Sequence, residues 1–551
     1  MESHVETHDV VVIGAGPNGI NQLRRLRQAG LDAIALEAGT GVGGAWFWNR
    51  YPGARLDSEC YSYGYTPEFS AEVAAEWEWD EEFADQPKLE AYYNFVVDRL
   101  DLRSHIRFES RVNSAIWDEE TRTWTVTTES GASYRSPHLV AAAGILSAPH
   151  VPDYPGIEDF RGRMLHTANW PAEGVDLTGK RVIVIGVGST GIQVIQTIAP
   201  QVEHLTVLQR TPNWAAPLNN FRYTPERQRE VREMAPQIMA LTGSTRSCFV
   251  RTPREDGTFD VSDSERAAIL EELYSAPGLS LYSGGFRDLL TDEAANREVT
   301  DFLAAKIAAR VNDPETARKL TPAHPFATKR PPMETKYFET YNLPHVNLVH
   351  LPEEPIIRFT EDGVQTSEGF YPADVIVVAT GFDAITGSYV RLGVRGADGV
   401  ALADWWDDGP RTYLGVFVHH FPNLFILGGP QGINGNHPRC ADFGSEWLVR
   451  LIQRLRADGI DRIEVPEAME ENWVEECSAL AENSLLRDAV AWQWGSNIPG
   501  KKRRYLMYIG SQPEFRQKLE SVLRSDFSGF TVEARTALGE SDPVPGASIP
   551  S

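Results

Sequence analysis

Acidic and basic side chains that could act together occur in two distant stretches of the chain. Asp57 lies in a segment rich in tryptophan and tyrosine, where a carboxylate is costly unless a cation pairs with it. Lys329 and Arg330 are adjacent cations followed by two prolines, which make the turn rigid. Two adjacent cations held rigid in this way are a poor choice for a mere surface turn. An exposed aspartate and a solvated basic turn remain the alternatives.

Two glycine-rich fingerprints of the form G-x-G-x-x-G could hold phosphates. Each follows a short apolar run, at 10–13 and 181–185, and each precedes a predicted helix. In this context the glycines let backbone N–H groups approach a pyrophosphate at a helix N-terminus. The glycines are Gly14, Gly16 and Gly19 in the first fingerprint, and Gly186, Gly188 and Gly191 in the second.

The residue that follows the second strand differs between the two fingerprints. Glu37 comes about 20 residues after the first, and a carboxylate there accepts both hydroxyls of a ribose but repels a 2′-phosphate. The first site therefore suits FAD or NAD. Arg210, followed by Thr211, occupies the corresponding place after the second fingerprint and favours NADP. This asymmetry predicts a tightly bound flavin with NADPH as its reductant.

Composition limits the class of protein. A chain of 551 residues predicts two or three domains, and its net charge of −25 argues against nucleic acid and anionic membranes as partners. No apolar run of about 18 residues and no signal peptide are found, so a cytoplasmic protein is expected. The four cysteines include no C-x-x-C, so we expect free thiols in a reducing cytosol, with no redox-active disulfide and no metal.

Short strands alternate with helices, which predicts an α/β fold with two Rossmann-like dinucleotide-binding domains. The segment 41–63 is too rich in Gly, Pro and aromatic residues for a regular element, so it is expected as a loop around a flat ring system. A β-meander is expected over 106–126, and disorder from Gly539 onward. The expected domains are FAD-binding over 1–147 and 381–551, and NADP-binding over 148–380 with a helical subdomain at 213–325.

The stretch 160–171 between the fingerprints carries the pattern F-x-G-x-x-x-H-x-x-x-W-P. This pattern resembles the signature of the Baeyer–Villiger monooxygenases, flavoenzymes that insert oxygen beside a ketone carbonyl. We expect an interdomain linker with a tight turn at its glycine and a rigid stop at its last proline. Its histidine more readily holds backbone geometry than acts as a general acid or base, which is the alternative. The pattern residues are Phe160, Gly162, His166, Trp170 and Pro171.

Other motifs occur in the order found in that family. The segment 43–57 resembles G-G-x-W-x-W-N-R-Y-P-G-A-R-x-D, and 329–342 resembles K-R-P-x-x-x-x-x-Y-x-E-T-x-N. A third, 491–501, resembles S-W-x-x-G-x-N-I-P-G-K, although Ala491 replaces the usual serine. The loop 434–437 is more polar than in many relatives, which weakens any substrate analogy. Together these motifs make the chain similar to a type I Baeyer–Villiger monooxygenase from about residue 8 to about residue 525.

The resemblance implies a mechanism and roles for particular residues. In the family, NADPH reduces the flavin, O2 forms a C4a-peroxyflavin, and this attacks a ketone to give a tetrahedral adduct that rearranges to an ester or lactone. Sulfides are a second expected substrate class. Arg330 would stabilise the negative species and Asp57 would hold Arg330, while Trp492 lies on an expected mobile lid. A monomer or weak homodimer is expected.

The resemblance also assigns cofactor-binding residues. For FAD it implies Gly14, Gly16, Gly19, Glu37, Gly44, Ala45, Trp46, Trp48, Asp57, Tyr63, Val112 and His437. For NADP it implies Arg55, Gly186, Gly188, Ser189, Thr190, Gly191, Gln193, Arg210, Thr211, Lys329, Arg330 and Trp492.

Three other readings share some of these features. A flavin-containing N- or S-monooxygenase shares both fingerprints but lacks the tryptophan-rich loop. A pyridine-nucleotide disulfide reductase needs a close cysteine pair, which the sequence does not show. A non-catalytic NADP sensor needs no flavin, and a yellow purified protein would exclude it.

Overall fold

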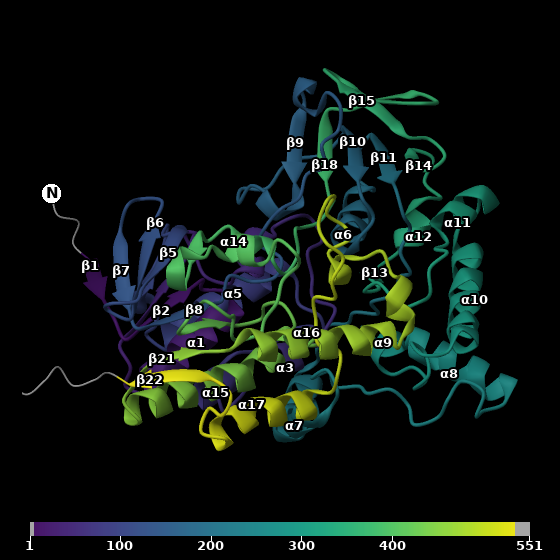
Figure 1. Cartoon of the computed structure of the whole chain (residues 1–551). Coiled ribbons are helices and arrows are strands. Elements are labelled where there is room, and N and C mark those ends of the chain that lie inside the picture. Colours follow the sequence, from purple (N-terminus) through teal and green to yellow (C-terminus); the bar gives the residue numbers. More distant parts are fainter. Residues whose placement is uncertain (1–4, 535–551) are drawn as a thin grey trace, which may run out of the picture.

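The computed structural model describes residues 5–534, so the predicted disorder from Gly539 onward lies outside the described residues. Figure 1 shows two parallel sheets in separate parts of the molecule. The first has five strands in the order β20-β8-β2-β3-β4. It confirms the α/β fold around the first fingerprint. Its strands are β2 (Val10–Ile13), β3 (Ala33–Leu36), β4 (Ile106–Arg107), β8 (His138–Ala141) and β20 (Leu424–Ile426).

The second parallel sheet has the order β14-β11-β10-β18-β9 and forms the upper lobe in Figure 1. In both sheets the central strands are buried throughout, as expected when helices cover both faces of a parallel sheet. Its strands are β9 (Arg163–His166), β10 (Arg181–Ile185), β11 (His204–Gln209), β14 (Val346–His350) and β18 (Val375–Val378).

Each fingerprint leads into a helix that covers its sheet. Helix α1 (Pro17–Gln28) follows the first fingerprint, and Pro17 is accommodated in its first turn. Helix α6 (Ser189–Ile198) follows the second fingerprint. Helix α15 (His437–Ala457) starts directly at the polar loop and packs against α1.

A third sheet, β1-β7-β6-β5-β19, contains the expected meander. The prediction was wrong for Ile106 and Arg107, which pair with β3 in the first sheet instead. The strand β5 alternates between buried and exposed positions, as a strand with one solvated face does. The strands are β1 (Val5–Thr7), β5 (Val112–Asp118), β6 (Thr123–Thr128), β7 (Ser133–Ser136) and β19 (Val394–Arg395).

The segment between β11 and β14 is mainly helical and lies below the second sheet in Figure 1. Its expected helices at 264–274 and 298–311 are present, and Ser262 with Glu265 forms a capping box at the start of the first. The helices are α7 (Pro225–Ser244), α8 (Asp263–Ser275), α9 (Ser280–Ser283), α10 (Glu293–Arg310), α11 (Pro314–Leu320) and α12 (Tyr337–Thr340).

The aromatic segment 41–63 is not wholly a loop. It contains two single-turn helices, α2 (Ala45–Trp48) and α3 (Cys60–Tyr63), so the prediction of no regular element was too strict. Short turns of this kind need only one or two backbone hydrogen bonds, which Gly and Pro at their flanks do not prevent.

The stretch 160–171 is part of the second sheet rather than a connection outside it. Four of its residues form β9, which pairs in parallel with β18 at the sheet edge. Phe160 is buried in the core beside Ile183. A Cβ at Gly162 would lie 2.4 Å from the Phe160 ring and 2.6 Å from the Asp374 carbonyl oxygen, so close packing, and not a tight turn, requires glycine there.

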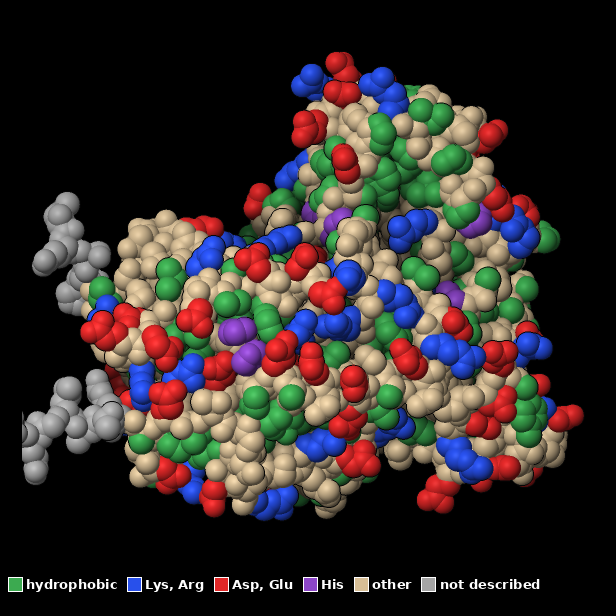
Figure 2. All heavy atoms as spheres, viewed as in Figure 1, with side chains coloured by type: hydrophobic (Ala, Val, Ile, Leu, Met, Phe, Trp, Pro, Cys, Tyr) green, Lys and Arg blue, Asp and Glu red, His purple; other side chains and the backbone are tan. Residues whose placement is uncertain are grey.

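The remaining elements surround these sheets. Figure 2 shows acidic and basic side chains interspersed over one face of the molecule. No helix within residues 5–534 is both long and apolar enough to cross a membrane. The remaining strands are β12 (Ala216–Pro217), β13 (Met333–Glu334), β15 (Ile356–Thr360), β16 (Gly363–Thr366), β17 (Phe370–Pro372), β21 (Ile460–Glu464) and β22 (Thr531–Ala534). The remaining α-helices are α4 (Ala71–Glu76), α5 (Gln86–Arg99), α13 (Gly387–Val390), α14 (Leu402–Trp405), α16 (Glu467–Glu482) and α17 (Gln512–Arg524).

Candidate active site between the two sheets

Arg330 and Asp57 form an ion pair although 273 positions separate them in the chain. The Arg330 guanidinium donates a hydrogen bond of 2.7 Å from Nη2 to Oδ1 of Asp57. Their side chains are 33% and 23% exposed, so the pair is neither on the open surface nor sealed in the core. Burial opposes the charge of Arg330, but Asp57 outweighs it and holds the pKa of the guanidinium above its ordinary value. Arg330 therefore keeps its positive charge, and the pair remains partly exposed.

Contacts on both sides hold Arg330 in place. The side chain of Asn213 donates to the Arg330 carbonyl oxygen at 3.0 Å. The following strand β13 pairs with β12, and Glu334 of β13 accepts a 2.7 Å hydrogen bond from Arg310 on α10. Because Glu334 is fully buried, this ion pair anchors the strand to the helical segment. The two prolines after Arg330 thus lead into a strand, not a free turn.

Backbone pairing holds Asp57. The segment before it bonds to the start of α5, through Leu56 N to the Ala84 carbonyl oxygen at 3.0 Å, and Cys60 N bonds to the Glu82 carbonyl oxygen at 2.8 Å. Asp57 lies between these two anchors. Its carboxylate can therefore turn toward Arg330 without moving the backbone.

Two aromatic hydroxyls and one imidazole lie around the ion pair. Tyr63 accepts a 3.0 Å hydrogen bond from the indole of Trp46, and burial raises the pKa of Tyr63 to about 12. Burial and the charge of Arg330 lower the pKa of His437 to about 4, so this imidazole is neutral at working pH. Tyr282 on α9 feels both charges of the pair, although burial dominates in raising its pKa. Nothing in the sequence singles out Tyr282, because it lies in the insertion that carries no motif.

The two fingerprints have nearly the same backbone geometry. Gly14 and Gly186 adopt φ angles of +100° and +102°, a region that favours glycine. A Cβ at Gly19 or Gly191 would collide with the carbonyl oxygen of the first glycine, at 1.9 and 2.1 Å. Each loop therefore requires these glycines to bring the helix N-terminus close to the strand, which leaves backbone N–H groups free for a pyrophosphate.

Glu37 lies at the end of β3 and is 5% exposed. Its carboxylate accepts hydrogen bonds from the backbone N–H groups of Ala15 and Gly39, at 2.8 and 2.7 Å. Burial raises the pKa of Glu37, and these two hydrogen bonds oppose the rise. Nearby is a cavity of about 400 Å³, and its lining includes Gly39, Trp48, Arg111, Asn169 and Trp170. The predicted Trp48 lines this cavity, whereas Val112 begins β5 beside it and does not.

Arg210 and Lys329 bring two positive charges together beyond the end of β11. Burial lowers the pKa of Lys329, and the charge of Arg210 lowers it further. Within residues 5–534 no carboxylate forms an ion pair with either side chain. Two neighbouring cations without a carboxylate partner fit a bound phosphate, which would relieve their repulsion.

A cluster from both parts of the chain connects the aromatic segment to α6. The Tyr51 hydroxyl donates to Oε1 of Gln193 at 2.9 Å, and Nε2 of Gln193 donates to the Arg55 carbonyl oxygen at 3.1 Å. The Arg55 guanidinium pairs with Glu81 at 2.7 Å. The structure thus brings together Arg55 and Gln193, both predicted. Tyr51 was in the quoted motif but was not singled out.

Two other predicted residues lie away from the ion pair. Trp492 occupies a one-turn 3-10 helix (Trp492–Trp494), and the following segment is tied down by the Asn497 side chain, which donates to the Phe382 carbonyl oxygen at 2.9 Å. His166 accepts a 3.1 Å hydrogen bond at Nδ1 from the backbone N–H of Ala168, as the favoured structural role predicts. Within residues 5–534, no hydrogen bond or ion pair joins either residue to Arg330.

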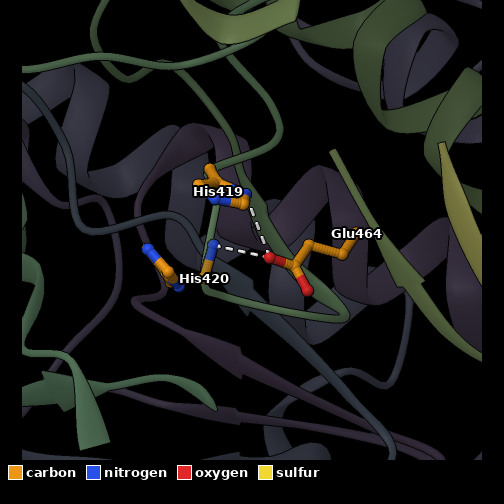
Figure 3. Close-up of side chains that lie close together, drawn as sticks. All are labelled: His419, His420 and Glu464. Atoms are coloured by element: carbon orange, nitrogen blue, oxygen red, sulfur yellow. Dashed lines mark hydrogen bonds and ion pairs between the residues drawn. The ribbon is translucent and has the colours of Figure 1, made fainter. Parts of the chain in front are cut away.

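A separate cluster of His419, His420 and Glu464 has the residue types of a metal site (Figure 3). Nδ1 of His419 lies 2.9 Å from the Val465 carbonyl oxygen, so it carries a proton and cannot also bind a cation. Glu464 pairs with Arg462 at 2.7 Å and also accepts from the backbone of His420. His419, Glu464 and Arg462 therefore form a network in which each hydrogen bond or ion pair has a protein partner.

A family model, several known proteins and several solved structures are similar to this chain. The family model of the pyridine nucleotide-disulphide oxidoreductases matches residues 11–273. The chain is 44% identical over 544 residues to the 2-oxo-Delta(3)-4,5,5-trimethylcyclopentenylacetyl-CoA monooxygenase of Pseudomonas putida, covering 95% of this chain and 98% of that protein. It is 37% identical over 535 residues to a Baeyer-Villiger monooxygenase of Pseudooceanicola batsensis, covering 96% and 97%. A crystal structure of OTEMO in complex with FAD and NADP superposes with a TM-score of 0.92 at 43% identity, covering 96% and 100%.

Proposed function

The chain belongs to the type I Baeyer–Villiger monooxygenases, FAD- and NADPH-dependent enzymes that convert ketones into esters or lactones, and we propose that Arg330 and Asp57 carry its catalysis. The observation that supports this most directly is the 2.7 Å ion pair between them, with both side chains partly exposed. Bound flavin, once reduced by NADPH, supplies the activated oxygen that is transferred to the ketone.

The protein supplies a fixed positive charge for this transfer. Arg330 stabilises the negative charge that develops on oxygen, because its guanidinium stays charged and cannot be neutralised by the reaction. Asp57 orients that guanidinium by accepting a hydrogen bond from its Nη2. The other N–H donors of Arg330 then remain for the reacting atoms. Neutral His437 and the Tyr63 hydroxyl add dipoles nearby without adding a competing positive charge.

The first sheet is proposed as the FAD domain, formed by residues 1–147 and 381–551. Glu37 would accept the ribose hydroxyls, and the fingerprint N–H groups would hold the pyrophosphate. The cavity beside Trp48 supports this placement, because it opens next to Glu37. The other proposed FAD contacts are Gly14, Gly16, Gly19, Gly44, Ala45, Trp46, Asp57, Tyr63, Val112 and His437.

The second sheet is proposed as the NADP domain, residues 148–380, with the helical subdomain at 213–325. Arg210 and Lys329 would bind the 2′-phosphate, which is supported by the absence of a carboxylate partner for either within residues 5–534. Arg330 is also proposed as a contact of retained NADP+. The other proposed contacts are Arg55, Gly186, Gly188, Ser189, Thr190, Gly191, Gln193, Thr211 and Trp492.

The test of the catalytic assignment is Arg330→Ala compared with Arg330→Lys. We expect Arg330→Ala to keep its flavin and to oxidise NADPH measurably, while ester formation falls by on the order of 100-fold or more. Arg330→Lys keeps a positive charge but loses the planar fork, so it should retain intermediate activity. Product mass from a ketone in air, measured beside flavin absorbance, checks both. Undiminished ester formation in Arg330→Ala would rule out the assigned role.

Substrate range, compartment and oligomeric state are also proposed. Sulfides are proposed as a second substrate class, and sulfoxide formation from a thioether in the same assay checks this. The enzyme is proposed to work in the cytoplasm as a monomer or weak homodimer. All four cysteines are free thiols, which suits a reducing compartment.

A further inference from the structure

Cys248 and Cys440 lie side by side although 192 positions separate them. Their sulfur atoms are 3.4 Å apart, and both residues are buried, at 1% and 5% exposure. Cys248 belongs to the loop after α7 in the helical segment, whereas Cys440 lies in the first turn of α15. The sequence showed four widely spaced cysteines and no pair, so only the fold brings these two thiols together.

The loop that carries Cys248 is fastened to its surroundings on both sides. The Ser247 carbonyl oxygen accepts from the backbone N–H of Asn436 at 2.9 Å, and the Arg246 carbonyl oxygen accepts from Gln512 N at 2.8 Å. Cys248 itself has φ of +57°, a region that a side chain rarely adopts. This conformation is strained for a non-glycine residue and is maintained by the neighbouring contacts. It also directs the Cys248 sulfur toward Cys440.

The hydrogen bond between the thiols makes them unequal. Cys440 donates its S–H to the Cys248 sulfur, and this bond and burial raise the pKa of Cys440 well above its usual range. The raised pKa of Cys440 keeps that thiol protonated, so it is not the sulfur that attacks first. Cys248 is therefore the attacking sulfur and Cys440 the resolving one.

We propose that Cys248 and Cys440 are a disulfide-forming pair that hydrogen peroxide oxidises, linking the helical segment to α15. Cys248 attacks one peroxide oxygen, the O–O bond breaks, and the products are a sulfenic acid and water. The Cys440 sulfur then displaces the sulfenic oxygen as a second water, and the S–S bond forms. Two thiols lose two electrons and two protons, and one peroxide is reduced to two waters.

The crosslink would lie close to the polar loop 434–437. Asn436, which bonds to Ser247, caps α15 one residue before His437, and the charge of Arg330 reaches His437. A bond between Cys248 and Cys440 would therefore fix the separation of the helical segment and the polar loop 434–437 at the edge of the catalytic ion pair. Because it closes a long loop of chain, it should also stabilise the fold.

The first test counts thiols in the holoenzyme with FAD and NADP+. After treatment with hydrogen peroxide, removal of excess oxidant and denaturation, we expect two of the four thiols to remain alkylatable. Peptide mass spectrometry should find one crosslinked peptide that contains Cys248 and Cys440, and dithiothreitol should restore all four thiols. Four remaining thiols, or only sulfinic acids, would overturn the proposal. A crosslink to Cys60 or Cys477 would also overturn it.

The second test uses isosteric variants. Cys440→Ser and Cys248→Ser should each lose the crosslink, whereas Cys477→Ser, a matched change at another buried cysteine in a helix, should keep it. Peroxide should raise the Tm of the wild type and of Cys477→Ser by several degrees, and dithiothreitol should reverse the shift. An equal shift in Cys440→Ser would contradict a bond between these segments as its cause.

Discussion

Glu37 and Arg210 occupy corresponding positions, one at the end of β3 and the other just after β11, and we propose that their opposite charges distinguish the two nucleotide sites. The structure adds to each residue what spacing alone does not show. Glu37 is buried and already accepts two backbone hydrogen bonds. Arg210 lies close enough to Lys329 to lower its pKa. The proposed second site thus contains a pair of cations, which supports phosphate binding there in a strongly acidic protein.

Arg210→Glu tests this pairing at the scale of one residue. The new carboxylate would pair with Lys329 and repel a 2′-phosphate, so we expect the KM for NADPH to rise on the order of 10- to 100-fold. The KM for NADH, which lacks that phosphate, should change little. Arg163→Glu, an exposed arginine on β9, serves as the matched charge reversal and should affect neither value. Steady-state kinetics with both nucleotides measures this, and equal rises for both would count against the phosphate site.

At the scale of elements, the network of His419 and Glu464 joins the segment before β20 to β21. The hydrogen bond to Glu464 raises the pKa of His419 above its ordinary value. Burial opposes the charge of Glu464, but His419, a backbone N–H and Arg462 together lower its pKa to about 2. Burial has the opposite effect on His420 and lowers its pKa. The pKa values of these two adjacent histidines are therefore shifted in opposite directions.

His419→Gln and His420→Gln test this contrast. A raised histidine pKa stabilises the fold fully below its unfolded value of 6.5, and the effect is lost as pH rises through the folded value. His419→Gln should therefore lower the free energy of unfolding by about 1 to 2 kcal/mol near pH 6 and by less near pH 9. His420→Gln should instead gain relative stability as pH falls. Chemical denaturation at both pH values measures this, and parallel curves would refute the pairing.

At the scale of the whole molecule, the aromatic segment 41–63 packs directly on α6, the helix that follows the second fingerprint. Gly53 marks the closest approach, since a Cβ there would lie 2.2 Å from Oγ1 of Thr197 and 2.6 Å from the Gln193 carbonyl oxygen. Tyr51 and Arg55 bond to Gln193 on either side of it. The loop that carries Asp57 is thus positioned against the helix that carries the second fingerprint.

Gly53→Ala compared with Gly131→Ala separates contact from backbone strain. Both glycines have similar positive φ angles, +83° and +85°, but a Cβ at Gly131 meets nothing within 4 Å. Gly131→Ala should therefore cost about 1 to 2 kcal/mol from strain alone. Gly53→Ala should lower the free energy of unfolding by more than this. It should also raise the KM for NADPH, because the new Cβ would displace the segment around residue 53 from α6. Thermal unfolding and kinetics test this, and identical effects of both substitutions would show that the contact does not matter.

Local patterns in the sequence were enough to predict much of this protein. The apolar strand at 181–185, the two fingerprints, the contrast of Glu37 with Arg210 and the family all follow from short segments, because strand burial and phosphate loops depend on neighbouring residues. The need of Asp57 for a cation was also anticipated, from the chemistry of a carboxylate among aromatic rings, and the resemblance to the family implied Arg330 as that cation.

Tertiary structure decided what depends on distant segments meeting. The stretch 160–171 reads as a linker because its pattern lies between two domains, but pairing with β18, which comes some 200 residues later, makes it a sheet edge. The charges of Arg330 and Asp57 both affect the pKa of Tyr282, which lies in an insertion without any motif. Cys248 and Cys440 carry no local signal, since their contact depends on where α15 docks. Local propensity acts over a few residues, whereas these contacts are set by the packing of whole elements.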